Sequence, residues 1–240
     1  MCQQTRVDTV IPYYERFVTS FPTPAALASA DEDAVMSHWS GLGYYRRARM
    51  LHAGAKDVVA RYGGEVPSGA EDRLSLPGVG RYTAGAIGSI AFGHEEAIVD
   101  GNVARVLSRV HRIPHELQST ASNKALWMHA EALVRGPRPG DLNQSLMELG
   151  ATVCTPTSPK CDACPIAKGC AALQEGDVSA FPVPKKKKKP KRVRLVASVA
   201  TARGMVWLQR GDKKLFGGLW GVPMLPIEKL DESSVRQAAL

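Results

Sequence analysis

The most constraining feature of the sequence is a cluster of cysteines. Four of its five cysteines lie within 17 residues, in the spacing Cys154-x6-Cys161-x2-Cys164-x5-Cys170. Four thiolates on one short loop can surround a single centre, and proteins use such sites to hold zinc or an iron–sulfur cluster. The fifth, Cys2, is remote, so a disulfide framework is not expected. Zinc ribbons usually carry two C-x2-C pairs and this loop carries one, which favours a cluster and leaves zinc open.

The composition is that of a globular chain. Its 240 residues are 44% hydrophobic and 22% charged, which suits a packed core and excludes wholesale disorder. No apolar run reaches the ~18 residues of a membrane span. The start MCQQTRVDTV also lacks the apolar region of a secretory signal. We therefore expect a cytoplasmic protein with no membrane partner.

The positive charge is concentrated at one end of the chain. The net charge is +8, yet residues 1–184 hold 17 Lys and Arg against 19 Asp and Glu, while residues 185–240 hold 14 against 4. The run KKKKKPKRVR at 185–194 supplies most of the excess. Such a run is typical of a solvated linker, and it can also attract phosphates. The high isoelectric point is therefore weak support for a nucleic-acid surface on the main domain.

Residues 1–175 are predicted to be helical throughout, with short connections punctuated by Pro and Gly. No strand is predicted before the basic run. The expected helices cover Val7–Val18, a segment with Val35, Met36 and Trp39 that is capped by Ser29 or Asp31, Arg46–Tyr62, Arg81–Phe92, Asp100–Arg112, Ser122–Val134 and Leu142–Cys154.

The pattern changes after Phe181. Beyond the basic run, RLVASVATARGMVWLQR has the alternating, β-branched character of two strands around Ala202-Arg203-Gly204. The segment FGGLWGVPML follows. About fifty residues with one hairpin are too few for a stable independent domain. We expect only the beginning of a β-rich domain here.

Two further motifs carry chemistry. In Leu76-Pro77-Gly78-Val79-Gly80 the glycines allow a sharp turn, and the helix from Arg81 directs its N-terminus to the same place. This is either an anion site suited to a phosphodiester or an ordinary connection between helices. About one helix later comes Val99-Asp100-Gly101-Asn102, in which the aspartate lies where a helix begins. Taken alone, it is most simply a helix cap.

The order of hairpin, aspartate and four-cysteine loop identifies a resemblance. The segments QQTRVDTVIPYYERF, GLGYYRRAR, LPGVGRYTAGAI, VDGNVARVLSR and LNQSLMELGATVC, with the cysteine loop, resemble the helix-hairpin-helix DNA glycosylases, and most closely the MutY-type adenine DNA glycosylases. The likeness runs from residue 1 to about residue 226. It implies a mainly α helix-hairpin-helix glycosylase fold with an iron–sulfur loop, followed by the start of a β-rich Nudix-like domain.

The resemblance also implies a domain order and a function. A helical domain with the hairpin covers 1–110, an iron–sulfur domain 111–176, a basic linker 177–194 and a partial Nudix-like domain 195–240. The implied activity is monofunctional removal of adenine mispaired with 8-oxoguanine, in base excision repair. The implied partner is double-stranded DNA carrying that mispair, bound by a monomer. Cys154, Cys161, Cys164 and Cys170 would hold a 4Fe–4S cluster.

Cleavage of an N-glycosidic bond needs a carboxylate beside the cationic sugar and an acid that protonates the leaving base. By resemblance Asp100 is the carboxylate, as electrostatic stabiliser or nucleophile. Tyr82 and Asn102 resemble the residues that orient it and the attacking water. The family's second acid is a glutamate that falls just upstream of Met1, so the chain is expected to be truncated at both ends.

The remaining site residues are also implied by the resemblance. Gln4 and Tyr44 match residues that insert at the lesion, and the hairpin residues Gly78, Val79 and Gly80 match the phosphate grip. Thr5 and Gln144 match residues that line the adenine pocket.

Two alternatives remain open at this stage. One is a DNA- or lesion-binding module without the acid, and therefore impaired in catalysis. The other is an endonuclease III-like glycosylase, a related class that also cuts the backbone through a lysine Schiff base just after the hairpin. The corresponding residue here is Tyr82, which cannot form an imine.

Overall fold

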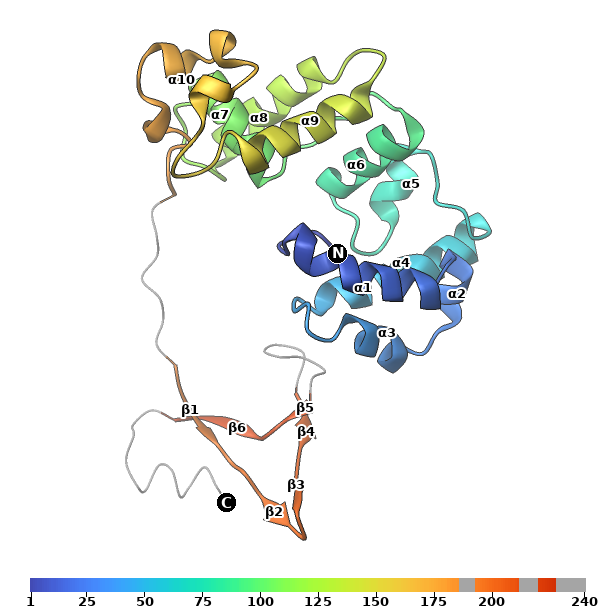
Figure 1. Ribbon diagram of the computed structural model, residues 1–240. Helices are drawn as coiled ribbons and strands as arrows, with labels where there is room; N and C mark the ends of the chain where they lie inside the picture. Colours follow the sequence, from blue (N-terminus) through green and yellow to red (C-terminus); the bar gives the residue numbers. More distant parts are fainter. Residues whose placement is uncertain (186–192, 212–219, 228–240) are drawn as a thin grey trace. The chain divides into compact units, whose positions relative to one another are not determined.

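The computed structural model describes residues 1–185, 193–211 and 220–227. It divides into two units, Met1–Lys185 and Lys186–Leu240. The first unit is helical (Figure 1), and its helices are α1 (Val7–Ser20), α2 (Pro24–Ser29), α3 (Glu32–Trp39), α4 (Arg46–Tyr62), α5 (Ala70–Ser75), α6 (Arg81–Phe92), α7 (Gly101–Val110), α8 (Thr120–Leu133), α9 (Pro139–Thr152) and α10 (Ala171–Gln174). Short 3-10 turns lie at Cys161–Ala163, Ala167–Gly169 and Val178–Ala180. No helix in the described residues is both long and apolar enough to cross a bilayer.

The helix boundaries follow from local chemistry. Asp31 caps α3 by accepting the N–H of Asp33, and Ser119 caps α8 in the same way from Ser122. At the C-terminal end of α4, Gly63 adopts φ 63°, the left-handed conformation in which helices commonly end. The predicted helices are confirmed to within a few residues.

Three short helices were not predicted from the sequence. α2 and α5 have six residues each and α10 has four, which is too short for an apolar period to appear. Start signals for α2 and α5 are nevertheless present: the hydroxyl of Thr23, just before Pro24, accepts the N–H of Ala26, and α5 carries Glu71 and Asp72 in its first turn.

The helical unit has two apolar cores. The first lies among α1–α4 and the chain that follows α3, and its buried residues include Phe17, Val35 and Trp39. The second lies among α7, α8 and the chain that enters α7, and it includes Ile98 and Leu107. Tyr82 and Met147 pack against the second core from α6 and α9. This core therefore supports the segment that carries Asp100.

Glycines allow unusually close contacts around the second core. A β-carbon at Gly85 of α6 would overlap the carbonyl oxygen of Ala97. A β-carbon at Gly140 would lie 2.6 Å from the carbonyl oxygen of Ser89. At Gly150 it would lie 2.6 Å from the β-carbon of Asn102, so α9 meets the first turn of α7 at this glycine.

The second unit contains short antiparallel strand pairs. β1 (Arg194–Ala197) pairs with β6 (Met224–Ile227), β2 (Thr201–Ala202) with β3 (Met205–Val206), and β4 (Gln209–Arg210) with β5 (Trp220–Gly221).

The predicted hairpin around Ala202-Arg203-Gly204 is confirmed. Arg203 and Gly204 both have positive φ, as a two-residue hairpin turn requires. The first four residues of FGGLWGVPML, 216–219, lie outside the described residues, and the remainder contains β5 and part of β6. The short strands of the described residues do not amount to a Nudix-like domain, so that part of the fold expectation is not supported here.

Candidate functional site

Asp100 and Tyr82 both lie beside the second apolar core, near enough for their charges to interact. Asp100 is the N-cap of α7, and its Oδ1 accepts the N–H of Val103 at 2.7 Å. The pKa of Tyr82, on the first turn of α6, is raised above its ordinary value by burial and then by the negative charge of Asp100. The phenol is therefore neutral at physiological pH, and it donates to the sulfur of Met147 at 3.5 Å. The structure brings together the two residues that were predicted from separate motifs.

The hairpin lies directly before Tyr82. Gly78 has φ 79°, and a β-carbon there would lie 2.5 Å from that of Met50 on α4. Gly80 is the N-cap of α6 and has no side chain to occupy the free N–H groups of that helix start. The turn therefore presents backbone donors at the positive end of a helix, which suits an anion.

Asn102 links the start of α7 to the cysteine loop through Arg105. Its Oδ1 accepts from Arg105 Nη2 at 2.9 Å, and the same nitrogen donates to the carbonyl of Gly150 at 2.7 Å. Arg105 Nε donates to the carbonyl of Cys154 at 2.7 Å. The pKa of Arg105 is lowered, because the effect of burial outweighs the opposite effect of the nearby Cys154.

The four predicted cysteines line a common pocket. The pKa of the Cys161 thiol is raised, first by burial and then by the negative charges of the other three cysteines in their thiolate form. In the described residues, no three His, Cys, Asp or Glu side chains are placed to hold a single metal ion. The four thiols line a shared space, and four thiolates suit a cluster with several metal centres, each taking one thiolate.

A buried arginine supports this pocket. Arg109, also on α7, is 2% exposed and donates from Nη1 to Cys154 Sγ at 3.2 Å. Its remaining donors reach the carbonyls of Thr155 at 2.8 Å, Pro156 at 3.1 Å and Phe181 at 3.0 Å. Hydrogen bonds to a ligating sulfur stabilise its thiolate and tune a cluster.

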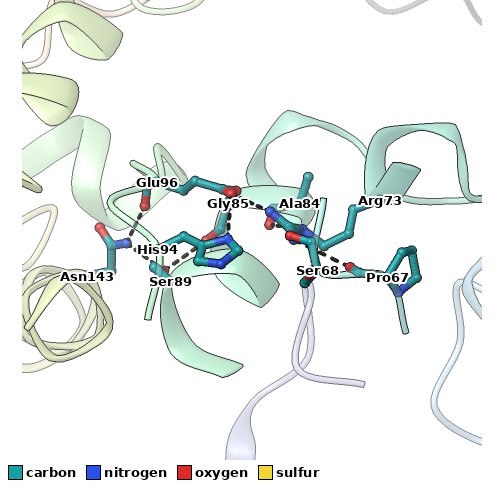
Figure 2. Close-up of polar contacts among 9 residues, drawn as sticks. All are labelled: Pro67, Ser68, Arg73, Ala84, Gly85, Ser89, His94, Glu96 and Asn143. Carbon is teal, nitrogen blue, oxygen red and sulfur yellow. Dashed lines mark hydrogen bonds and ion pairs between the residues drawn. The ribbon is translucent and has the colours of Figure 1, made fainter. Parts of the chain in front are cut away.

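A buried polar network joins α5 and α6, the helices on either side of the hairpin, to the chain that leads to Asp100 (Figure 2). Arg73, at the end of α5, is fully buried and pairs with the carboxylate of Glu96. It also donates to the carbonyl of Ala84 at 3.2 Å and to that of Ser68. A β-carbon at Gly88 would overlap the Glu96 carboxylate, so this glycine makes room for the ion pair.

The network continues into α9. Asn143 donates from Nδ2 to the carbonyl of Glu96 at 2.9 Å and to Ser89 Oγ at 2.8 Å, and Ser89 in turn donates to the carbonyl of Gly85. The helices on both sides of the hairpin, α5 and α6, are thereby linked to Glu96, which lies four positions before Asp100.

Removal of the Glu96 carboxylate is expected to destabilise the helical unit strongly. Glu96→Ala leaves the Arg73 guanidinium buried without its counter-charge, which typically costs about 3–5 kcal/mol of unfolding free energy. As a control, Glu131→Gln breaks an exposed pair with Arg81 and should cost less than about 1 kcal/mol. Urea unfolding followed by circular dichroism compares the two; equal losses would contradict the importance of the buried pair.

The other predicted residues lie on three separate segments: the chain before α1, the loop before α4, and α9. Gln4 and Tyr44 are exposed, and both have left-handed backbone conformations, with φ 60° and 48°. Thr5 Oγ1 accepts from Arg47 at 3.0 Å. Gln144 is exposed on α9 and donates to the carbonyl of Gly140 at 3.2 Å.

Sequence reasoning missed the arginines that connect these parts. Arg73, Arg105 and Arg109 make most of the long-range polar contacts around Asp100 and Cys154. A signal was available for one of them, because Arg109 falls within the apolar pattern of α7, between Leu107 and Val110, where an exposed cation is not expected.

Two family models match the chain. Residues 1–130 match the HhH-GPD superfamily of base excision DNA repair proteins. Residues 154–170 match the iron–sulfur binding domain of endonuclease III. The second match begins at Cys154 and ends at Cys170, so it covers all four predicted ligands.

Similar proteins carry the name adenine DNA glycosylase. The adenine DNA glycosylase of Homo sapiens is 54% identical over 175 residues, which are 72% of this chain and 32% of the relative. That of Mus musculus is 52% identical over 186 residues, 76% of this chain and 36% of the relative. The chain thus spans about a third of the length of these relatives.

Solved structures agree on the fold. A thermostable thymine-DNA glycosylase superposes with a TM-score of 0.63 at 32% identity, covering 72% of this chain and 80% of that one. A non-covalent endonuclease III–DNA complex gives a TM-score of 0.60 at 24% identity, covering 73% of this chain and 80% of that chain.

Proposed function

The chain belongs to the HhH-GPD superfamily of base excision DNA repair proteins, and from that premise we propose that it removes adenine mispaired with 8-oxoguanine from double-stranded DNA. Its loop at 154–170 belongs to the iron–sulfur binding domain of endonuclease III and holds a 4Fe–4S cluster. The identity of about half of the aligned residues to adenine DNA glycosylases supports adenine as the base removed.

The observation that carries the proposal is the shared site of Asp100 and Tyr82 beside the hairpin. Asp100 lies at the positive end of α7, and Tyr82 at the start of α6, directly after the turn that presents backbone donors. A duplex gripped by its phosphates at this turn would bring an extruded nucleotide to the carboxylate. We place the sugar next to Asp100.

The chemistry of the site follows from its charges. Loss of a base from the sugar passes through an oxocarbenium-like state, which the Asp100 carboxylate stabilises. Tyr82 stays protonated and donates a hydrogen bond, so it orients groups without becoming a nucleophile. Because Tyr82 has no amine, backbone cleavage through an imine is not expected at this position.

Adenine release and strand cleavage can be separated by experiment. A duplex with adenine opposite 8-oxoguanine is incubated with the protein and then analysed with and without hot alkali, which cuts only where a base is missing. We expect strand cuts after alkali alone, and none above background from an adenine·thymine control. Cuts without alkali would support an endonuclease III-like activity, and binding without cuts would support a lesion-binding module.

DNA affinity is expected to fall steeply with salt, because phosphate contacts release counterions. The residues at 185–189 contribute by their charge, although all but Lys185 lie outside the described residues. Replacing all five lysines by serine should reduce the slope of log K against log salt by about 1 for each lysine that touches a phosphate. Lys56→Ser with Lys124→Ser, at exposed positions of the helical unit, is the control. An unchanged slope in the five-lysine variant would exclude this run from binding.

We further propose that the short strands of residues 193–227 begin the domain that inspects 8-oxoguanine. The likeness of FGGLWGVP to Nudix-like domains supports this assignment. The proposed boundaries remain 1–110, 111–176, 177–194 and 195–240. Deleting residues 195–240 should reduce discrimination between 8-oxoguanine and guanine opposite adenine, while the cluster is retained.

A further inference from the structure

Arg47 contacts both segments that are proposed to enter the DNA. It is the second residue of α4, and it reaches the chain around Gln4 and the loop before Tyr44. We propose that Arg47 is a positioning residue that holds Gln4 and Tyr44 at a fixed separation, so that both side chains enter the duplex together. The inference rests on the proposed function, which assigns the two side chains to insertion.

The first set of contacts brackets Gln4. Arg47 Nη1 donates to the carbonyl of Met1 at 2.7 Å and to that of Gln3. Nη2 donates to Thr5 Oγ1 at 3.0 Å. The residues immediately before and after Gln4 are therefore both bound by one guanidinium, while Gln4 itself stays exposed.

The second set of contacts brackets the loop that ends at Tyr44. Nη2 also donates to the carbonyls of Gly43 at 3.2 Å and Leu42 at 3.4 Å. The guanidinium carbon lies 5.3 Å from the centre of the Tyr44 ring and 5.4 Å from that of the buried Trp39. Trp39 Nε1 donates to the same Gly43 carbonyl at 3.1 Å. The loop is thus fixed from the core side, and the Tyr44 side chain is 60% exposed.

The backbone supports a role in positioning. Gln4 and Tyr44 both have positive φ, a conformation that residues with a β-carbon avoid unless the surroundings impose it. Such conformations cluster at active sites and ligand clamps, where the surrounding structure holds them in place. Here the imposing contacts converge on Arg47.

The location of Arg47 is otherwise unfavourable. A cation in the first turn of a helix is opposed by the helix dipole, and partial burial lowers the pKa of Arg47. Its neighbour Arg49 pairs instead with Glu32, with Nε 3.1 Å from Oε1. The donors of Arg47 are therefore bound to carbonyl groups and a hydroxyl group of the protein itself.

The test measures base unstacking in the duplex. The fluorescent base 2-aminopurine is placed next to the adenine·8-oxoguanine pair, because its emission rises when it leaves the stack. Arg47→Lys keeps the charge but cannot bind five acceptors. We expect it to lose most of the fluorescence rise and to reduce the preference for the mispair over undamaged duplex about five- to tenfold. Its affinity for undamaged duplex should stay within about twofold.

Arg49→Lys is the matched control and should behave as the unsubstituted protein. If Arg47→Lys also keeps the full fluorescence rise and the full preference, or if it loses undamaged-duplex affinity in the same proportion, the inference is wrong. Thr5→Val keeps the arginine and removes one acceptor, and it should give an intermediate fluorescence rise. If Arg47→Lys does not fold, an unaltered Thr5→Val protein would overturn the inference. No fluorescence rise and no preference in the unsubstituted protein would instead overturn the proposed function.

Discussion

Replacing Asp100 by asparagine is expected to lower the rate of adenine release at least about a hundredfold while duplex affinity changes little. Asparagine can still cap α7 by accepting the N–H of Val103, as Asp100 does at 2.7 Å. The variant therefore keeps the helix start and loses the negative charge that stabilises a sugar cation. The rate is measured under single-turnover conditions on the duplex with adenine opposite 8-oxoguanine.

A matched control exists at another helix start. Asp31 caps α3 by accepting the N–H of Asp33 at 3.1 Å, so Asp31→Asn makes the same chemical change away from the site. It should leave both release and binding within about twofold, because asparagine is an equally good cap. Wild-type release by the Asp100→Asn variant would remove Asp100 from the chemistry. Parallel loss of binding and release would point to a folding defect.

Replacing Cys164 by alanine is expected to abolish the cluster. Iron should fall from about four atoms per chain to well below one. Each iron takes one thiolate, so a site with only three cysteines cannot hold the complete cluster. The loop should lose its fold as well, since metal binding and local folding are coupled. Iron and acid-labile sulfide in anaerobically purified protein measure the first effect, and protease sensitivity of residues 154–170 measures the second.

Cys2→Ala provides the control, because Cys2 is a free, exposed thiol that lies outside the loop. This variant should retain full iron and sulfide. Stoichiometric zinc in place of iron in the unsubstituted protein would contradict the cluster assignment. Full iron in Cys164→Ala would show that this thiol is not a ligand.

Much of the helical architecture could be predicted from local sequence. The starts and ends of helices depend on neighbours within four residues, such as the cap at Asp31 or the left-handed Gly63 at the end of α4. The hairpin glycines and the cysteine spacing are local in the same sense. Short helices such as α2 and α5 were missed because six residues do not establish a period.

The contacts that assemble the site could not be predicted in this way. Arg105 binds the carbonyl of Cys154 across 49 positions, and Arg73 pairs with Glu96 across 23. Their acceptors are mostly backbone carbonyls, which every residue possesses, so no residue type marks the partner in the sequence. The left-handed conformations of Gln4 and Tyr44 were equally hidden, because neither is a glycine.

The close glycine contacts around the second core have a consequence for mutational tolerance. Gly85, Gly140 and Gly150 carry no group that can bind or react, yet each lies where any side chain would collide with backbone or with Asn102. Alanine at Gly150 must push α9 away from the first turn of α7, which directly follows Asp100. Substitutions that inactivate the protein are therefore expected at positions whose residues neither bind nor react. Saturation mutagenesis of the chain should find these three glycines as intolerant of substitution as the four loop cysteines.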